Sequence, residues 1–408
     1  MSCDEPQPRH ATQHALRDSS SLWPKSISDP ALLVVIQWLI HGGADRATLE
    51  LLQGIKRLAP KVRRYLVTTI PVKLEWVAEV HQAVDAVFSL SDMTPVDMEK
   101  RLAQLIEQLN VSSVLVVNSI VGYDALPYIR RCRRQVRVIS QLHGFMRDPL
   151  TEEFVGHSVY AATRFDDLID GYVVISRFVR DQLVGRFGVS VSKIRVMYCG
   201  IDLNRFRSAR RKRFPPGRAA RVLWLGRLSW EKDPVMAVRV AHAWKKSHGN
   251  RSMEFCLVGS GELHDEVAAW IRAENLDDIV VLSPAIDDPI SLYEWADCLM
   301  VTSRYEGIPL VIYQAMAAEL PVITSIRNTS IPEVLAPNDA YFVKQQNSPV
   351  EYVAAIERMS RQPDEVRSKV KRAALAATPY IYDRHILKML EFLFPDGTRK
   401  ETPNTQRP

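Results

Sequence analysis

Short runs rich in β-branched residues alternate with helix-like patterns along almost the whole sequence, and this alternation most restricts the folds open to the chain. Parallel strands need crossover connections, which are usually helices, so the pattern predicts an α/β protein with parallel sheets. We expect strands at Leu32–Leu39, Tyr65–Thr69, Ala86–Leu90, Ser113–Asn118, Arg137–Leu142, Tyr172–Ser176, Arg195–Cys199, Arg221–Gly226, Glu254–Gly259, Ile279–Ser283, Asp297–Ser303, Pro321–Thr324 and Ala340–Val343.

The length of 408 residues suits two domains of about 150–200 residues each. Two prolines, a glycine and six basic residues in the run RSARRKRFPPGR predict a linker at 205–218. We expect a first domain at 29–204, a second at 219–378, and a helix at 379–395 that packs back on the first domain. Ligands of open parallel sheets bind at the carboxyl ends of the strands, so the site should lie between the two domains.

Three features of the sequence indicate where the protein is located and whether it binds a metal: the ends of the chain, its apolar runs and its cysteines. Residues 1–28 and 396–408 are polar and are expected to be disordered tails. The longest apolar run, Ala31–Ile40, falls short of the 18–20 residues of a membrane-spanning helix, and the N-terminus lacks a secretory signal pattern. The five cysteines form no CxxC pair, so we expect a cytoplasmic protein with no metal site.

Two basic clusters contribute much of the net charge of +6. They could bind an anionic membrane surface or nucleic acid, or they could be a solvated helix end and a solvated linker. We expect no nucleic-acid partner and keep a possible membrane surface open. The first cluster consists of Arg130, Arg131, Arg133, Arg134 and Arg137, and the second lies between Arg207 and Arg213.

The second half of the chain holds two motifs on strand-to-helix loops. In GRLSWEKDP, Arg227 and Lys232 lie five residues apart near a helix N-terminus, which suits a diphosphate, although surface charges are the alternative. In VGSGE, Gly259 and Gly261 form a tight turn. His264 in the sixth position departs from the dinucleotide fingerprint, so an ordinary turn stays open.

A third motif, LMVTSRYEGIPLVIYQAMAAELPVIT, places Glu306 and Gly307 in a loop after a strand. Pro309 is predicted to take the first position of a helix that runs to about Glu319. Backbone N–H groups around Gly307 could bind phosphate, and Glu306 could accept hydrogen bonds from sugar hydroxyls. The alternative for Glu306 is a buried structural carboxylate paired with an arginine.

With these segments in order, the chain resembles the family 4 retaining glycosyltransferases of the GT-B fold, over about Leu32–Leu393. The family pattern GRLxxxKG, GxG and EGxPxxxxEAMAxGxPV stands here as GRLSWEKD, GSG and EGIPLVIYQAMAAELPV. In the first half, LIHGGADRATLELL looks like the family's glycine loop, QLHGF like its histidine segment, and YCGIDLNRF like the end of its first domain.

The resemblance implies two doubly wound Rossmann-like domains that face each other across a cleft. It also implies a metal-independent, retaining transfer of a hexose-type sugar from a nucleotide diphosphate to a glycan or lipid-linked acceptor, with no cofactor, in polysaccharide biosynthesis. The expected catalytic residues are His143, Glu306, Arg227 and Lys232. The expected donor-binding residues are Gly42, Gly43, Gly259, Gly261, Ser303, Gly307, Ile308, Pro309, Leu310 and Gln314.

Four departures from the family pattern keep alternatives open. The family's second glutamate, which holds the donor ribose, is Gln314 here, and its usual glycines stand as Asp233 and Leu320. Polar residues of SIRNTSIPE replace a diglycine. A non-catalytic sugar-nucleotide-binding or scaffold protein would explain these losses. A sugar-nucleotide epimerase would need further carboxylates in the cleft, and a phosphorylase would need a cofactor-lysine motif.

Overall fold

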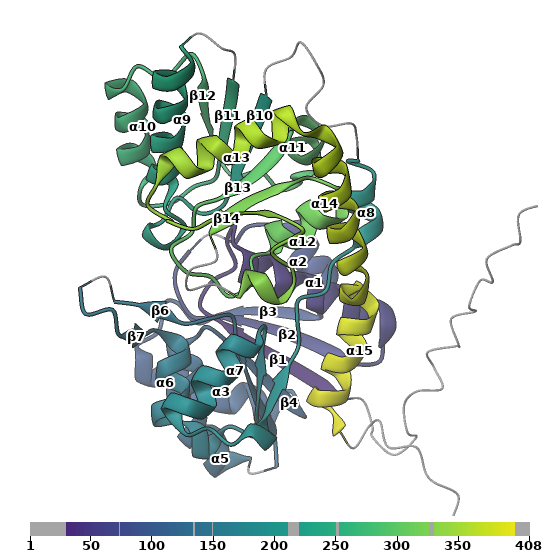
Figure 1. The fold of residues 1–408 in the computed structure, drawn as a ribbon. Coiled ribbons are helices and arrows are strands. Elements are labelled where there is room, and N and C mark those ends of the chain that lie inside the picture. The colour runs from purple at the N-terminus through teal and green to yellow at the C-terminus, as the bar shows by residue number, and fades with distance from the viewer. Residues whose placement is uncertain are drawn as a thin grey trace, which may run out of the picture.

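The computed structural model describes residues 30–72, 74–133, 135–148, 150–210, 220–249, 253–325 and 330–395. Two parallel sheets flanked by helices lie in separate halves of the molecule (Figure 1). Both predicted tails and most of the predicted linker lie outside the described residues. Arg205 and Arg207, at the start of that linker, belong to the short helix α8 (Leu203–Arg207), which packs on α12 (Leu310–Ala317).

The first sheet has the order β3-β2-β1-β4-β5-β8-β9, and all its neighbouring strands are parallel. Strand β1, near the centre of this sheet, is buried along its whole length because helices cover both faces of the sheet. The strands are β1 Ala31–Ile36, β2 Arg63–Thr68, β3 Ala86–Ser89, β4 Ser113–Val117, β5 Arg137–Leu142, β8 Gly171–Val174 and β9 Ile194–Val196. The helices are α1 Gly43–Leu58, α2 Val77–Ala83, α3 Pro95–Gln108, α4 Ile120–Asp124, α5 Leu126–Cys132, α6 His157–Arg164 and α7 Arg177–Phe187.

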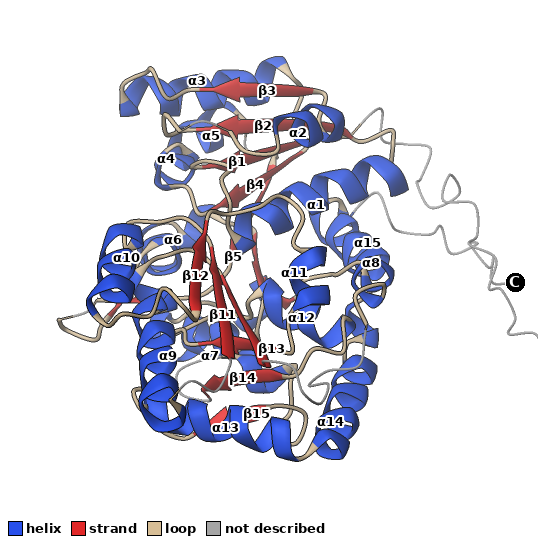
Figure 2. Cartoon of the chain, turned by 90° about the horizontal axis from the view of Figure 1, so that it is seen from above, coloured by secondary structure: helices blue, strands red, loops and turns tan. Residues whose placement is uncertain are grey.

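The second sheet has the order β12-β11-β10-β13-β14-β15 and is also parallel (Figure 2). Its strands are β10 Ala220–Leu225, β11 Met253–Val258, β12 Val280–Ser283, β13 Cys298–Val301, β14 Val322–Ser325 and β15 Tyr341–Val343. Its helices, besides α12, are α9 Pro234–His248, α10 His264–Ala273, α11 Ile290–Trp295, α13 Pro349–Arg361 and α14 Pro363–Ala376.

Each predicted strand is present, with ends that differ by at most three residues from the prediction. A two-stranded antiparallel hairpin, β6 (Met146–Arg147) with β7 (Phe154–Val155), was not predicted, because its paired segments are only two residues long. Pro309 precedes the first residue of α12 as its N-cap, so the prediction that it is the first helical residue was wrong by one position.

The order of strands reverses between β1 and β4 in the first sheet and between β10 and β13 in the second. At such a switch point the connecting helices lie on opposite faces, and the loops at the carboxyl ends leave a crevice. An apolar cluster also joins the halves, since Ile175 and Leu203 of the first half belong to the same core as Ile308 and Tyr313 of the second. The carboxylate of Glu333 caps α7 through the backbone N–H groups of Arg177 and Phe178, both at 2.8 Å.

The last helix, α15 (Tyr382–Leu393), returns to the first half of the molecule and lies beside α1 (Figure 1). The side chain of Ile386 in α15 is fully buried, in the same core as Leu52 and Ile55 of α1. Asp383 pairs with Arg57 across the same contact. Helix α15 therefore contributes to the core of the first half.

We expect Ile386→Ala to lower the free energy of unfolding by about 2–5 kcal/mol, because it removes buried methyl groups from a packed core. Urea denaturation measures this loss. The matched control is Leu387→Ala, whose side chain is 38% exposed and whose replacement should cost less than about 1 kcal/mol. Equal losses in the two variants would contradict the packing of α15 described here.

Candidate active site

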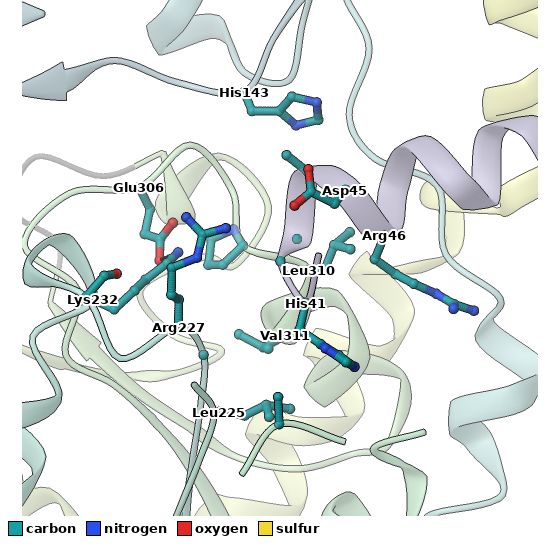
Figure 3. Close-up of a pocket in the computed structure, with 18 of the residues that line it drawn as sticks. His41, Asp45, Arg46, His143, Leu225, Arg227, Lys232, Glu306, Leu310 and Val311 are labelled. Atoms are coloured by element: carbon teal, nitrogen blue, oxygen red, sulfur yellow. Dashed lines mark hydrogen bonds and ion pairs between the residues drawn. The ribbon is translucent and has the colours of Figure 1, made fainter. Parts of the chain in front are cut away.

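A cavity of about 640 Å³ lies between the two halves, at the carboxyl ends of the strands on both sides (Figure 3). Loops that follow β1, β4 and β5 form one wall, and loops that follow β10, β11, β12 and β13 form the other. Of the predicted site residues, those that line it are Gly42, Gly43, His143, Arg227, Lys232, Gly259, Ser303, Glu306, Gly307, Ile308, Pro309, Leu310 and Gln314.

Gly261 is the predicted donor-binding residue that does not line this cavity. A Cβ built on Gly261 would lie 2.4 Å from the carbonyl oxygen of Leu228, and one built on Gly259 would lie 1.8 Å from that of Gly226. Both glycines therefore allow two loops of the second half to approach each other closely. The structure gives Gly261 this packing role in place of direct contact with the cavity.

Lys232 and Glu306 form an ion pair on the wall of the second half, with Nζ and Oε1 2.5 Å apart. The Ser303 hydroxyl donates to the same oxygen at 2.7 Å. The side chain of Glu306 is 9% exposed, and that of Lys232 is 25% exposed. The partner of Glu306 is thus a lysine rather than the arginine considered from the sequence, and the pair lies within the cavity instead of being purely structural.

Arg227 follows β10 and extends across the cleft toward the loop that begins α1. Its terminal nitrogen lies 2.8 Å from the position that a Cβ on Gly42 would occupy. Its Nε is buried and has no hydrogen-bond partner among the described residues. A buried donor without a partner costs free energy, so this guanidinium is suited to a ligand that supplies an anionic oxygen.

The N-terminus of α12 opens into the same cavity, because its N-cap Pro309 and first residue Leu310 both line it. No side chain caps this end. The first backbone N–H groups of a helix have no intrahelical partner, and the helix dipole adds a partial positive charge there. Two cationic side chains and a helix N-terminus therefore lie on one side of the cleft.

The two halves touch backbone to backbone at Gly307 and Gly144. A Cβ on Gly307 would lie 2.1 Å from the carbonyl oxygen of His143 and 2.5 Å from Cδ1 of Ile175. A Cβ on Gly144, which has φ of +150°, would lie 3.3 Å from the nitrogen of Gly307. The lack of side chains at both positions brings the loop of Glu306 against the loop of His143.

The Nε2 atom of His143 is buried and has no hydrogen-bond partner among the described residues. Burial, and to a smaller extent repulsion from His385, lower the pKa of His143 to about 4. The ring is therefore neutral near pH 7 and can form a hydrogen bond with a sugar hydroxyl.

Asp45 in the first turn of α1 was not among the predicted site residues, although it lies in the segment LIHGGADRATLELL. It lines the cavity and is 5% exposed. Burial raises the pKa of Asp45 to about 7, against a smaller lowering by Arg227 and by a backbone hydrogen bond at Ile40. Its Oδ2 lies 3.1 Å from the position of a Cβ on Gly42, beside the end of Arg227.

Gln314 of α12 lines the cavity, but its side-chain oxygen accepts a hydrogen bond of 2.7 Å from the hydroxyl of Tyr293. Tyr293 is fully buried. The amide therefore has its NH2 group left for a ligand, whereas a carboxylate at this position would keep one free acceptor oxygen.

Two of the departures from the family pattern have a local explanation. Asp233 has φ of +50° and caps α9 through the backbone N–H of Met236, and aspartate tolerates this left-handed conformation. At the end of α12 the left-handed residue is Glu319, with φ of +50°, whereas Leu320 is buried. The missing glycine therefore corresponds to Glu319 and not to Leu320.

At the outer part of the cavity, His41 of the first half contacts Asp287 of the second half. The two atoms that make this contact, Nε2 of His41 and Oδ1 of Asp287, lie 2.9 Å apart. The ring of His41 packs edge-on against Trp76 at a centroid distance of 4.8 Å. Ala285 and Ile286, from the loop after β12, also line the cavity.

The arginines of the first basic cluster largely serve contacts within the fold. Arg130 donates to the carbonyl oxygens of Val136 and Leu168, and Arg137 donates to that of Phe392. Arg133 bonds Asn110, and Arg134 lies outside the described residues. None of the helices in the described ranges has the length and apolar character needed to cross a bilayer.

Two doubly wound α/β halves with a cleft between them have the architecture of the GT-B class of fold. Sequence models agree with this class: residues 41–205 match "Glycosyltransferase Family 4" and residues 206–376 match "Glycosyl transferases group 1". The chain belongs to this glycosyltransferase family.

Similar proteins include an amylovoran biosynthesis glycosyltransferase of Erwinia amylovora, 27% identical over 44% of this chain and 50% of that protein. A D-inositol 3-phosphate glycosyltransferase of Acidothermus cellulolyticus is 27% identical over 55% of this chain and 53% of its own length. The chain spans about half the length of these curated relatives. Among solved structures, Anabaena Alr3699/HepE with UDP and glucose has a TM-score of 0.72 at 15% identity, covering 90% of this chain and 100% of that one.

We expect Gly307→Ala to lower the melting temperature, because the added methyl group would clash with the His143 carbonyl and the loops must separate at a cost of about 1–3 kcal/mol. Calorimetry measures this shift. Gly185→Ala is the matched control, since nothing lies within 4 Å of its Cβ position inside α7 and alanine favours helices. An unchanged melting temperature for Gly307→Ala would show that the halves do not touch there.

Proposed function

We propose that the protein is a metal-independent, retaining glycosyltransferase that moves a hexose-type sugar from a nucleotide diphosphate to a glycan or lipid-linked acceptor in polysaccharide biosynthesis. The observation that carries this proposal is the buried, unpartnered Nε of Arg227 in a cleft that also holds Lys232 and the N-terminus of α12. This arrangement suits the two phosphates of a donor, since cations and a helix dipole stabilise their charge.

In the proposed reaction, the bond between the anomeric carbon and the terminal phosphate oxygen breaks as the acceptor oxygen attacks the same face of the sugar. The departing phosphate oxygen takes the acceptor's proton, so the products are the glycoside and a nucleoside diphosphate. Arg227 and Lys232 stabilise the charge that develops on the leaving group. Neutral His143 orients the sugar, and Glu306 accepts hydrogen bonds from its hydroxyls while it holds Lys232.

The choice of donor can start from the solved relatives. The Anabaena structure was determined with UDP and glucose, and another structure of the same protein contains UDP-glucose. UDP-glucose is therefore the first donor to test, followed by a panel of other nucleotide sugars. A ligand that binds the native state raises the melting temperature, so thermal shift ranks the donors without knowledge of the acceptor.

Arg227→Ala should lower kcat/KM for donor turnover by about 100-fold or more, since it removes a cation from the leaving group. Release of nucleoside diphosphate from the best donor measures it. Arg272→Ala is the control, because Arg272 is exposed on α10 away from the cavity. If Arg227→Ala and the control matched the wild type, the diphosphate would not bind at this side of the cleft.

A second candidate is a catalytically weak sugar-nucleotide-binding or scaffold protein, and the occupied oxygen of Gln314 favours it. Gln314→Glu should tighten donor binding by up to about tenfold, because one carboxylate oxygen can keep the bond to Tyr293 while the other accepts from the ribose. Calorimetric titration of wild type and Gln314→Glu measures the change in Kd.

The same pair of proteins separates enzyme from scaffold. Transfer or donor hydrolysis by the wild type supports the enzyme, whereas activity that appears only in Gln314→Glu supports the scaffold. Tyr293→Phe in the wild-type background is the control for the geometry of residue 314: it frees the amide oxygen and should recover part of the affinity gain without adding charge.

A further inference from the structure

Asp45 and Arg227 approach the same point from opposite sides of the cleft (Figure 3). The nitrogen of the guanidinium and the oxygen of the carboxylate lie 2.8 and 3.1 Å from the Cβ position of Gly42. Among the described residues, no ion pair within 4.0 Å joins the two side chains, and the partner of the Asp45 carboxyl is a backbone hydrogen bond at Ile40. A buried carboxyl therefore faces the space into which Arg227 directs its charge.

The proposed donor would place a diphosphate in this space, and this inference rests on that proposed function. An ionised Asp45 would then stand beside two phosphate charges, and like charges at close range strongly favour the protonated form of a carboxyl. The phosphates would also compete for Arg227, which is the charged residue that holds the pKa of Asp45 down. Both effects act in the same direction.

We propose that Asp45 is a donor-positioning residue that binds a nucleotide sugar as the neutral acid, donating its O–H to a phosphate oxygen. The site then takes up a proton whenever a donor enters a cleft in which Asp45 was ionised. Asp45 has the required starting state, because burial raises its pKa to about 7 in the free protein. A carboxyl with its ordinary pKa would be too weakly protonated for this role near neutral pH.

Other ionisable groups around Asp45 must be separated from this effect. Arg46 and Glu50 lie on its own helix and pair with each other, and Glu50 is the next carboxyl along α1. Lys232 and Glu306 pair with each other on the opposite wall of the cleft, and His41 precedes the helix. His143, on the loop above, has a pKa of about 4 and stays neutral from pH 6 to 9.

The sign of the pH dependence follows from the raised pKa. Below pH 7 the free protein already carries the proton, so binding takes up little. Above pH 7 the free protein has lost it, and each donor bound must recover about one proton. The affinity should therefore be constant below pH 7 and weaken by up to about tenfold for each pH unit above it. The nucleotide sugar keeps both phosphate charges over this range and adds no titration of its own.

The test is calorimetric titration of the full-length wild-type protein with UDP-glucose, or with the donor that gives the largest thermal shift, from pH 6 to 9 in buffers of different ionisation enthalpy. We expect uptake of close to one proton per donor at pH 8.5 and close to none at pH 6. Asp45→Asn keeps the shape and a donor group but cannot titrate. Its Kd should be flat with pH and, at pH 8.5, at least tenfold tighter than that of the wild type.

His41→Gln is the control, because His41 is the neighbouring imidazole in the loop that leads into α1, and it should retain the proton uptake of the wild type. Loss of uptake in His41→Gln with retention in Asp45→Asn would overturn the assignment. Weaker binding by Asp45→Asn with a wild-type Kd that does not depend on pH would also overturn it, since Asp45 would then act as an ionised acceptor for a hydroxyl. Failure of the wild type to bind any nucleotide sugar would instead contradict the proposed function.

Discussion

A guanidinium whose Nε is buried and has no hydrogen-bond partner among the described residues is the constraint around which the cleft is organised. Removing a guanidinium nitrogen from water without a hydrogen bond costs free energy, and Nε of Arg227 is in this state in the folded protein. Lys232 is treated differently, because Glu306 and Ser303 hold it in a defined pair. One cation is thus left available and the other is positioned, which suits an anionic ligand that must be bound in one orientation.

The close backbone contact between the halves makes this electrostatic arrangement possible. Gly307 and Gly144 bring the loop of Glu306 against that of His143, while Gly42 leaves room for the end of Arg227. Side chains at these positions would widen the cleft and admit water, which weakens interactions between charges by raising the effective dielectric. Glycine is therefore needed at these positions because it lets the two halves approach closely. The close approach excludes water and so strengthens the interactions between charges in the cleft.

The sequence predicted the fold well because strand and helix patterns are local. Buried runs such as Leu32–Leu39 and Arg137–Leu142 have the composition of central parallel strands, and both strands are present. The ends of strands were less accurate, since they depend on which loop hydrogen bonds replace the ladder. The family pattern also brought residues from the two halves to one cavity, as Gly42 and Arg227 show.

Asp45 was missed because no local pattern reports the pKa of a buried carboxyl whose charged neighbour, Arg227, comes from the other half of the chain. The bond from Tyr293 to Gln314 was equally hidden, since the two residues lie on different helices. Gly261 shows the converse case: its motif predicted a donor contact, whereas in the structure it packs closely on Leu228 and does not line the cavity.

The balance of charge in the cleft connects these observations. Two cations, Arg227 and Lys232, face two carboxyls, Glu306 and Asp45. With all four ionised, the charges of these four side chains cancel. With Asp45 neutral, the same side chains carry a net positive charge toward the ligand. The state of one buried carboxyl at the start of α1 therefore changes the charge that these four side chains present to a dianion.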